Sequence, residues 1–156
     1  MSGVEAMRRW MYRGGRPNRL ARILNRLSAV QFGRGILAPD NWVTLEVAGR
    51  RSGNTISCPL VLTPYEGERY LVSMLGRDAN WVANVRAARG EAVLRHGRAE
   101  RVRLVDVDTA GRAPILRRYL ALAPGARAHL PVDRHAPLSE FERIAGDYPV
   151  FRVTAP

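Results

Sequence analysis

The stretch that decides the fold spans residues 42–75 and reads WVTLEVAGRRSGNTISCPLVLTPYEGERYLVSML. From Val43 to Ala48, apolar residues alternate with polar or small ones, which is the two-residue period of a strand with one buried face. Residues 56–62 and 69–75 predict a second and a third strand, joined by a short hairpin at Glu66-Gly67. The stretch therefore predicts the start of a β-sheet.

The turn between the first two predicted strands has the sequence Gly49-Arg50-Arg51-Ser52-Gly53. It places two guanidinium groups and a hydroxyl beside backbone N–H groups that the flanking glycines leave uncovered. This combination suits an anion, phosphate above all. We therefore interpret the turn as a binding site.

The chain after residue 75 predicts three helices and three more strands. A helix over residues 80–89, with Asp78 or Asn80 as its cap, precedes two strands joined at His96-Gly97. Further helices are expected over residues 112–122 and 138–145, with a last strand over 149–153. Six strands with helices around and between them predict an α+β protein with a mainly antiparallel sheet or barrel.

Length and composition place this chain among single-domain proteins. Its 156 residues fit one domain, residues 1–156, with a hydrophobic core large enough to be stable without disulfide bonds or structural metals. A single cysteine, Cys58, excludes an internal disulfide and fits a reducing compartment. No apolar run predicts a signal peptide or a membrane span, so we expect a cytoplasmic protein.

The net charge of +11 is concentrated in an N-terminal basic arm, residues 1–40. All 25 basic residues are arginine, and eight of them lie within residues 1–37 beside one acid, Glu5. Residues 17–30 have the apolar spacing of an amphipathic helix with a basic face. Three interpretations stay open: a helix packed on its own domain, peripheral contact with an anionic membrane, and a nucleic-acid contact. The last is disfavoured because no nucleic-acid-binding motif accompanies the charge.

The sequence contains no set of residues that performs chemistry unaided. No helix or strand places His129, Asp133 and His135 on one face, so we expect no metal. Cys58 has no base near it in sequence, and we expect a buried thiol. Nucleophile-elbow and P-loop patterns are absent. An enzyme built on this chain therefore needs a cofactor. Trp81 is a candidate wall for a flat cofactor ring, with core packing as the alternative. Asn84 is a candidate polar contact to the same cofactor.

Several motifs in order give a resemblance to a known family. They are Gly-Arg-Arg-Ser-Gly, Cys58-Pro59-Leu60, the Glu-Gly hairpin, Val-Ser-Met-Leu-Gly at residues 72–76, and Trp81-x-x-Asn84-x-Arg86. Together they resemble the deazaflavin-dependent nitroreductase family, split β-barrel proteins that bind coenzyme F420. The resemblance covers residues 42–107 and implies a split barrel with F420 as cofactor, FMN being the less favoured choice.

The resemblance also implies which residues form the cofactor site. The turn would hold the phosphate and acidic tail of the deazaflavin, one strand would line the cofactor, a following segment would lie under its ring, and the start of a helix would close the phosphate side. In that order, the implied cofactor-binding residues are Arg50, Arg51 and Ser52; Ile56, Ser57, Cys58, Pro59, Leu60 and Val61; Ser73, Met74, Leu75 and Gly76; and Asn80, Trp81 and Asn84.

The implied activity is hydride transfer from reduced F420 to a small-molecule acceptor, quinone-like, enone or nitro. Nitro-reducing members carry a Tyr-Pro-x-Tyr stretch after the second helix, whereas this chain has Ala123-Pro124-Gly125-Ala126, so the acceptor stays open. The proton donor is unknown; Tyr119 is a candidate, with core packing as the alternative. The competing hypothesis is a non-catalytic carrier of a flavin, haem-like or lipid ligand, and both a monomer and a homodimer fit.

Overall fold

The computed structural model describes residues 41–156. The amphipathic helix predicted within the basic arm lies outside the described residues. Within the described part of the chain, none of the helices combines the length and the apolar character needed to cross a membrane.

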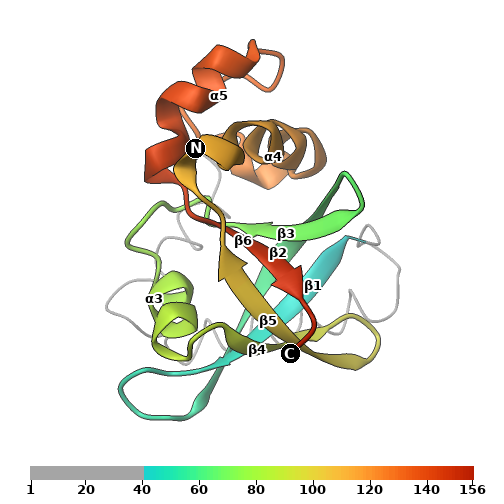
Figure 1. Cartoon of the computed structure of the whole chain (residues 1–156), viewed down its shortest axis with the longest axis vertical. Helices are drawn as coiled ribbons and strands as arrows, with labels where there is room; N and C mark the ends of the chain where they lie inside the picture. The colour runs from blue at the N-terminus through green and yellow to red at the C-terminus, as the bar shows by residue number, and fades with distance from the viewer. Residues whose placement is uncertain (1–40) are drawn as a thin grey trace.

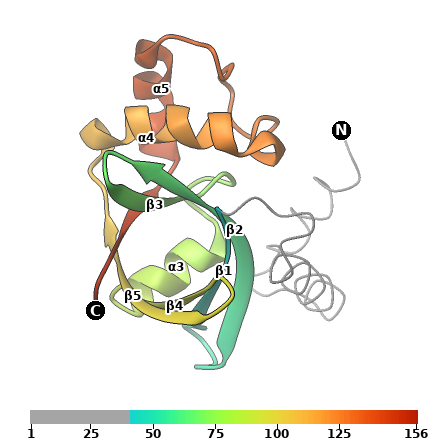
Figure 2. The ribbon, with the colours of Figure 1, turned by 90° about the vertical axis from the view of Figure 1, so that its right-hand side faces the viewer.

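Six strands form a closed barrel within residues 41–156 (Figures 1 and 2). Each strand pairs antiparallel with its neighbours, in the order β1-β2-β3-β6-β5-β4, and β1 closes the ring against β4. The strands are β1 (Trp42–Ala48), β2 (Thr55–Tyr65), β3 (Glu68–Val72), β4 (Glu91–Arg95), β5 (Ala99–Asp106) and β6 (Val150–Thr154). The predicted α+β fold built on an antiparallel split barrel is confirmed.

Tight turns join the strands that are adjacent in sequence, as their glycines predict. The β2–β3 hairpin has Glu66 at φ 48° and Gly67 at φ 79°, the two left-handed residues of a type I′ turn. Between β4 and β5, Gly97 has φ 73° and the His96 N–H donates to the Arg98 carbonyl at 3.0 Å. Both predicted hairpins are confirmed.

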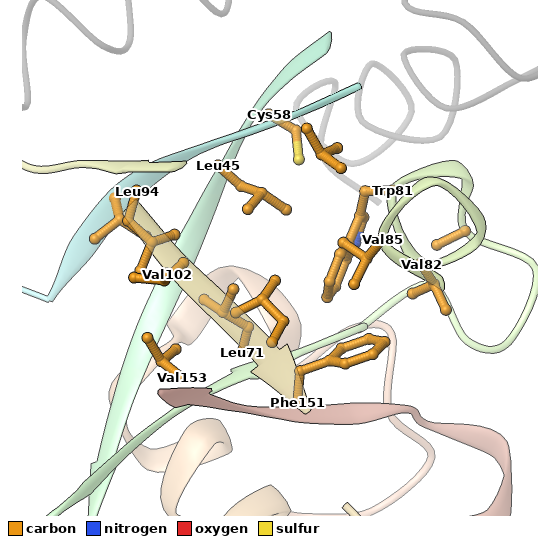
Figure 3. Packing of buried hydrophobic residues seen from close by; sticks show 14 residues of the cluster. Leu45, Cys58, Leu71, Trp81, Val82, Val85, Leu94, Val102, Phe151 and Val153 are labelled. Atoms are coloured by element: carbon orange, nitrogen blue, oxygen red, sulfur yellow. The ribbon is translucent and has the colours of Figure 1, made fainter. Parts of the chain in front are cut away.

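One hydrophobic cluster fills the barrel (Figure 3). The apolar face predicted for β1, with Val43, Leu45 and Val47, is buried there, at most 3% exposed. Helix α3 (Asn80–Ala87) adds Trp81, whose ring meets Phe151 of β6 at 5.6 Å between centroids. α3 is therefore part of the barrel's own core (Figure 2).

A second cluster lies between the barrel and two helices, α4 (Thr109–Leu122) and α5 (Leu138–Ile144), with short 3₁₀ turns η2 (Pro124–Ala126) and η3 (Ala145–Asp147) beside them (Figure 1). Arg112 of α4 is only 8% exposed and donates to the carbonyls of Val107 at 2.9 Å and Ala145 at 3.0 Å. Burial lowers the pKa of this guanidinium. These two hydrogen bonds connect α4 to the segment before it, at Val107, and to η3, at Ala145.

Several predicted boundaries are wrong: β2 runs to Tyr65 instead of residue 62, and α3 ends at Ala87 instead of residue 89. β3 ends at Val72 instead of residue 75, because the next residues turn away from the sheet. α4 begins at Thr109 instead of Arg112, in a tight first turn where the Gly111 N–H donates to the Asp108 carbonyl at 2.9 Å. The N-cap position of α3 is Ala79, and no side chain caps the helix, in contrast to the cap expected from Asp78 or Asn80. The Asn80 side-chain oxygen lies toward Arg50 instead.

Candidate functional site

The glycine-flanked turn, residues 49–53, is closed by its own backbone. The Gly49 N–H donates to the Asn54 carbonyl at 2.8 Å, and the Gly53 N–H donates to the Gly49 carbonyl at 2.9 Å. Gly53 has φ 76°, and a Cβ on Gly49 would lie 2.9 Å from Ile56 Cδ1. The Ser52 hydroxyl accepts from the Asn54 N–H at 3.1 Å. Gly53 therefore meets the left-handed conformation of the turn, Gly49 has little room for a side chain, and the Ser52 hydroxyl adds a hydrogen bond within the turn.

Arg50 fastens this turn to the start of α3. Its backbone N–H and its guanidinium both donate to Asn84 Oδ1, at 3.1 and 2.9 Å, and a longer contact of 3.5 Å reaches Asn80 Oδ1. The structure therefore brings together three residues that the sequence assigned to one site. Arg51, in contrast, is exposed and makes no hydrogen bond or ion pair within residues 41–156. The two arginines differ in kind: Arg50 positions the turn and Arg51 carries an available charge.

Asn84 is buried, at 1% exposure, and only half of its amide is satisfied. Its oxygen accepts both hydrogen bonds from Arg50, which fixes the orientation of the amide, while its Nδ2 has no partner among the described residues. A buried donor without a partner costs about 1–3 kcal/mol. An acceptor supplied by a ligand would remove this cost.

The strand predicted to line the cofactor divides its side chains between the two clusters. Cys58, 2% exposed, packs inside the barrel together with Leu60, and Val61 packs under α4. The prediction of a buried thiol is confirmed. Ile56, Ser57 and Pro59 are half-buried. β2 pairs with β1 as far as Val61 and with β3 from Leu62 onward.

A second tight turn follows β3 and forms the floor of a cavity. The Ser73 hydroxyl is buried and donates to the Gly76 carbonyl at 2.7 Å, while Gly76 has φ 92° and donates its N–H back to the Ser73 carbonyl at 3.2 Å. Met74, Leu75 and Gly76, three of the predicted site residues, line this open cavity of about 530 Å³. Its volume lies within the range of about 300–1,000 Å³ typical of small-molecule sites.

The remaining lining of the cavity was not predicted from the sequence. It consists of Arg77, Asp78, Ala79, His129, Asp147 and Tyr148. The Tyr148 hydroxyl donates to the His129 carbonyl at 3.1 Å, and Arg77 lies 3.9 Å from Asp147. Burial, and secondarily the Asp147 charge, raise the pKa of the Tyr148 phenol. The one signal available in the sequence was the Tyr148-Pro149 pair just before the last strand.

Trp81 and Tyr119 lie in the cores. Each is 4% exposed, Trp81 inside the barrel and Tyr119 between α4 and its neighbours, and neither lines the cavity. Both positions match the alternative of core packing. No group of three His, Cys, Asp or Glu residues within residues 41–156 could hold a metal ion.

The turn and the cavity meet at the start of α3. Asn80 contacts Arg50 of the turn, and the preceding residue, Ala79, lines the cavity. The site therefore combines one available cation, one buried amide donor and a partly apolar recess within the same region of the barrel. This arrangement can bind an elongated ligand that has an anionic end and a flat, weakly polar end.

The sequence matches no family model and no curated protein. The fold, however, is similar to solved structures. An F420-H2 dependent reductase, FDR-A, aligns with a TM-score of 0.50 at 15% identity, over 72% of this chain and 93% of that one. A candidate 5-nitroimidazole antibiotic resistance protein from Bacteroides thetaiotaomicron aligns at 0.50 and 11% identity, over 79% and 77%. A protein of unknown function from Agrobacterium tumefaciens aligns at 0.52 and 13% identity, over 82% and 54%.

Proposed function

We propose that this protein is an oxidoreductase that binds the deazaflavin F420 and reduces a small hydrophobic acceptor. The observation that carries the proposal is the docking of the glycine-flanked turn, through Arg50 and Asn84, beside the cavity floored by residues 74–76. The similarity in fold to an F420-H2 dependent reductase supports the same conclusion.

The residues present fit a ligand of this type. Arg51 would pair with the phosphate and acidic tail, and the exposed Ser52 hydroxyl would keep its hydrogen for the same anion because it accepts from Asn54. Charge-assisted hydrogen bonds of this kind contribute about 1.5–3 kcal/mol each. Asn84 Nδ2 would gain the partner that the described residues do not supply. The ring would lie over residues 74–76.

When bound and reduced, the deazaflavin supplies a hydride, and the protein supplies position and exclusion of water. The acceptor class is quinone-like, enone or nitro. Such an acceptor would enter the open cavity beside Met74 and Leu75, where apolar surface favours a flat, weakly polar molecule.

A fluorescence titration of the full chain with F420, and in parallel with FMN, tests this proposal. We expect micromolar or tighter binding of F420 and weaker binding of FMN. Arg51→Ala should weaken F420 binding by about tenfold to a hundredfold, because it removes one charge-assisted contact. The matched control is Arg118→Ala on the exposed side of α4, which should stay within twofold of the wild type.

The alternatives are decided by the same titration. Tighter binding of FMN than of F420 would make the protein a flavin-dependent member of the split-barrel fold. Binding of neither would contradict the proposal and favour the carrier hypothesis with a haem-like or lipid ligand. Equal losses in Arg51→Ala and Arg118→Ala would show that net charge, and not the turn, holds the ligand.

A further inference from the structure

Tyr148 lines the same cavity as the apolar side chains of Met74 and Leu75. Its ring is half-buried against the α4–α5 cluster, and its hydroxyl donates to the backbone carbonyl of His129 at 3.1 Å. Met74 and Leu75 face the same space. A flat acceptor in this cavity would therefore have one fixed phenol with which its oxygen could form a hydrogen bond.

Two backbone hydrogen bonds fix the chain directly after Tyr148. The carbonyl of Pro149, the next residue, accepts from the Ser73 N–H at 2.9 Å, and the Val150 carbonyl accepts from the Val107 N–H at 2.8 Å. The segment before β6 is thus fastened to the turn that floors the cavity. A phenol held in this way loses little freedom when it binds a ligand, which favours both affinity and directed proton transfer.

We propose that the Tyr148 hydroxyl binds the oxygen of a carbonyl or quinone acceptor in this cavity and delivers the proton that its reduction requires. The inference rests on the proposed function for the source of the hydride. The proposed proton donor therefore lies on the segment before β6. Tyr119, the candidate proton donor from the sequence, is buried in α4.

Arg77, another polar residue of the lining, fits this role less well. Its guanidinium lies 3.9 Å from the exposed Asp147 carboxylate, which is a competing partner for its N–H groups. Burial raises the pKa of Tyr148, which keeps the phenol protonated at neutral pH and ready to donate. Its hydrogen now lies toward His129, and rotation about the Cζ–Oη bond would redirect it to the acceptor.

The step balances in atoms and charge. A hydride carries one hydrogen nucleus and two electrons. A quinone that receives one hydride from the reduced deazaflavin is left with one anionic oxygen. The Oη–H bond of Tyr148 breaks, a new O–H bond forms on that oxygen, and the product is a hydroquinone. Water entering the open cavity returns a proton to the tyrosinate. An enone would follow the same scheme through its enolate oxygen.

Binding measured without cofactor provides the first test. The probes are menadione and 2-methylnaphthalene, which share a carbon skeleton and differ by two carbonyl oxygens. The variants are Tyr148→Phe, which keeps the ring, and the control Tyr70→Phe, a half-buried tyrosine of β3 packed against the same cluster but away from the cavity. We expect wild-type protein to prefer menadione, and Tyr148→Phe to reduce that preference about three- to tenfold.

The ratio of the two affinities separates a direct contact from a structural one. If Tyr148 only supported the loop, both probes would weaken together and the ratio would not change, which would overturn the inference. Tyr70→Phe should leave both affinities within twofold. This arm needs no cofactor, so its success or failure is distinguishable from that of the proposed function.

Turnover provides the second test. With reduced F420 and menadione, Tyr148→Phe should lower kcat about a hundredfold, with a smaller change in KM, because general acid catalysis contributes about 10²–10⁴-fold. Tyr70→Phe should retain wild-type kcat. A kcat for Tyr148→Phe within threefold of the wild type would exclude proton delivery by this phenol.

Discussion

At the scale of single residues, Asn84 connects the glycine-flanked turn to the barrel core. It is buried beside Trp81 and Val85 on the inner side of α3, yet its oxygen holds both the backbone and the guanidinium of Arg50. Buried polar groups need hydrogen-bond partners, and Arg50 supplies two of them to the Asn84 oxygen. The turn and the core are therefore coupled through one amide.

Replacing Asn84 with leucine should lower the free energy of unfolding by about 1 kcal/mol, because the loss of the acceptor for the Arg50 N–H and guanidinium outweighs the removal of the unpartnered Nδ2. Urea unfolding of the chain measures this change. Asn80→Ala serves as the control and should cost less than about 0.5 kcal/mol, since its 3.5 Å contact with Arg50 is solvent-exposed. A leucine variant as stable as the wild type would show that the turn is held by its own backbone alone.

The sequence predicted the part of the site that local patterns define. Glycine spacing indicated the turn, and residues 80 and 84 fall on one helix face, so their approach to each other could be expected. His129 and Tyr148 could not be placed, because they come from segments on either side of α5 whose positions depend on tertiary packing. Arg112 was predicted only as a helix residue, since its burial depends on the Val107 and Ala145 carbonyls.

At the scale of elements, the joint between α3 and β4 permits no side chain at Gly90. This residue has φ 83°, and a Cβ there would lie 2.3 Å from the Leu104 carbonyl oxygen. Its own carbonyl accepts from the Leu104 N–H at 2.8 Å, so α3 leads directly into the sheet. The close approach, and not only the left-handed conformation, makes glycine necessary.

A pair of glycine substitutions separates these two causes. Gly97→Ala, with φ 73° and no atom within 4 Å of the added Cβ, should lower stability by about 1–2 kcal/mol from backbone conformation alone. Gly90→Ala should lower the stability by roughly a further 2 kcal/mol or more, because the backbone at Leu104 must also move. Thermal unfolding of both variants measures the difference. Equal losses would contradict the close contact at Gly90.

Element boundaries were predicted less well than element types. The alternating apolar residues of β1 and of the later strands predicted one buried face per strand, and these faces are buried in the barrel. The end of β3 was missed because Met74 and Leu75 continue the apolar run of the strand, while the Ser73 hydroxyl closes a turn with Gly76. A hydrogen bond between a side chain and a nearby carbonyl leaves no trace in hydrophobic periodicity.

At the scale of the whole molecule, an ion pair spans the strands on both sides of β6. Arg69 of β3 makes two hydrogen bonds with the Glu100 carboxylate of β5, at 2.9 and 2.7 Å. These bonds lower the pKa of Glu100 below its ordinary value of 4.5. Folded protein therefore holds this carboxylate ionised at a pH at which the unfolded chain begins to protonate it.

The stability from this pair should be present above pH about 4.5 and disappear as the pH falls through the lowered pKa. Glu100→Gln should flatten the acid side of the stability profile, by less than about 1 kcal/mol because both side chains are about 40% exposed. Urea midpoints between about pH 3 and 6 measure it. Glu142→Gln on the exposed side of α5 should keep the wild-type slope, and the same slope in both variants would argue against the pair.

The position of β6 also determines when the barrel can close. It is the last strand in chain order, but it lies between β3 and β5, where Leu71 pairs with Phe151 across an interval of eighty residues. Until residues 150–154 leave the ribosome, β3 and β5 each keep an unpaired edge, and the nascent chain carries the hazard of edge-to-edge association. Closure of so long a loop is slow. The protein is therefore exposed to aggregation mainly during synthesis, after which ring closure removes both edges.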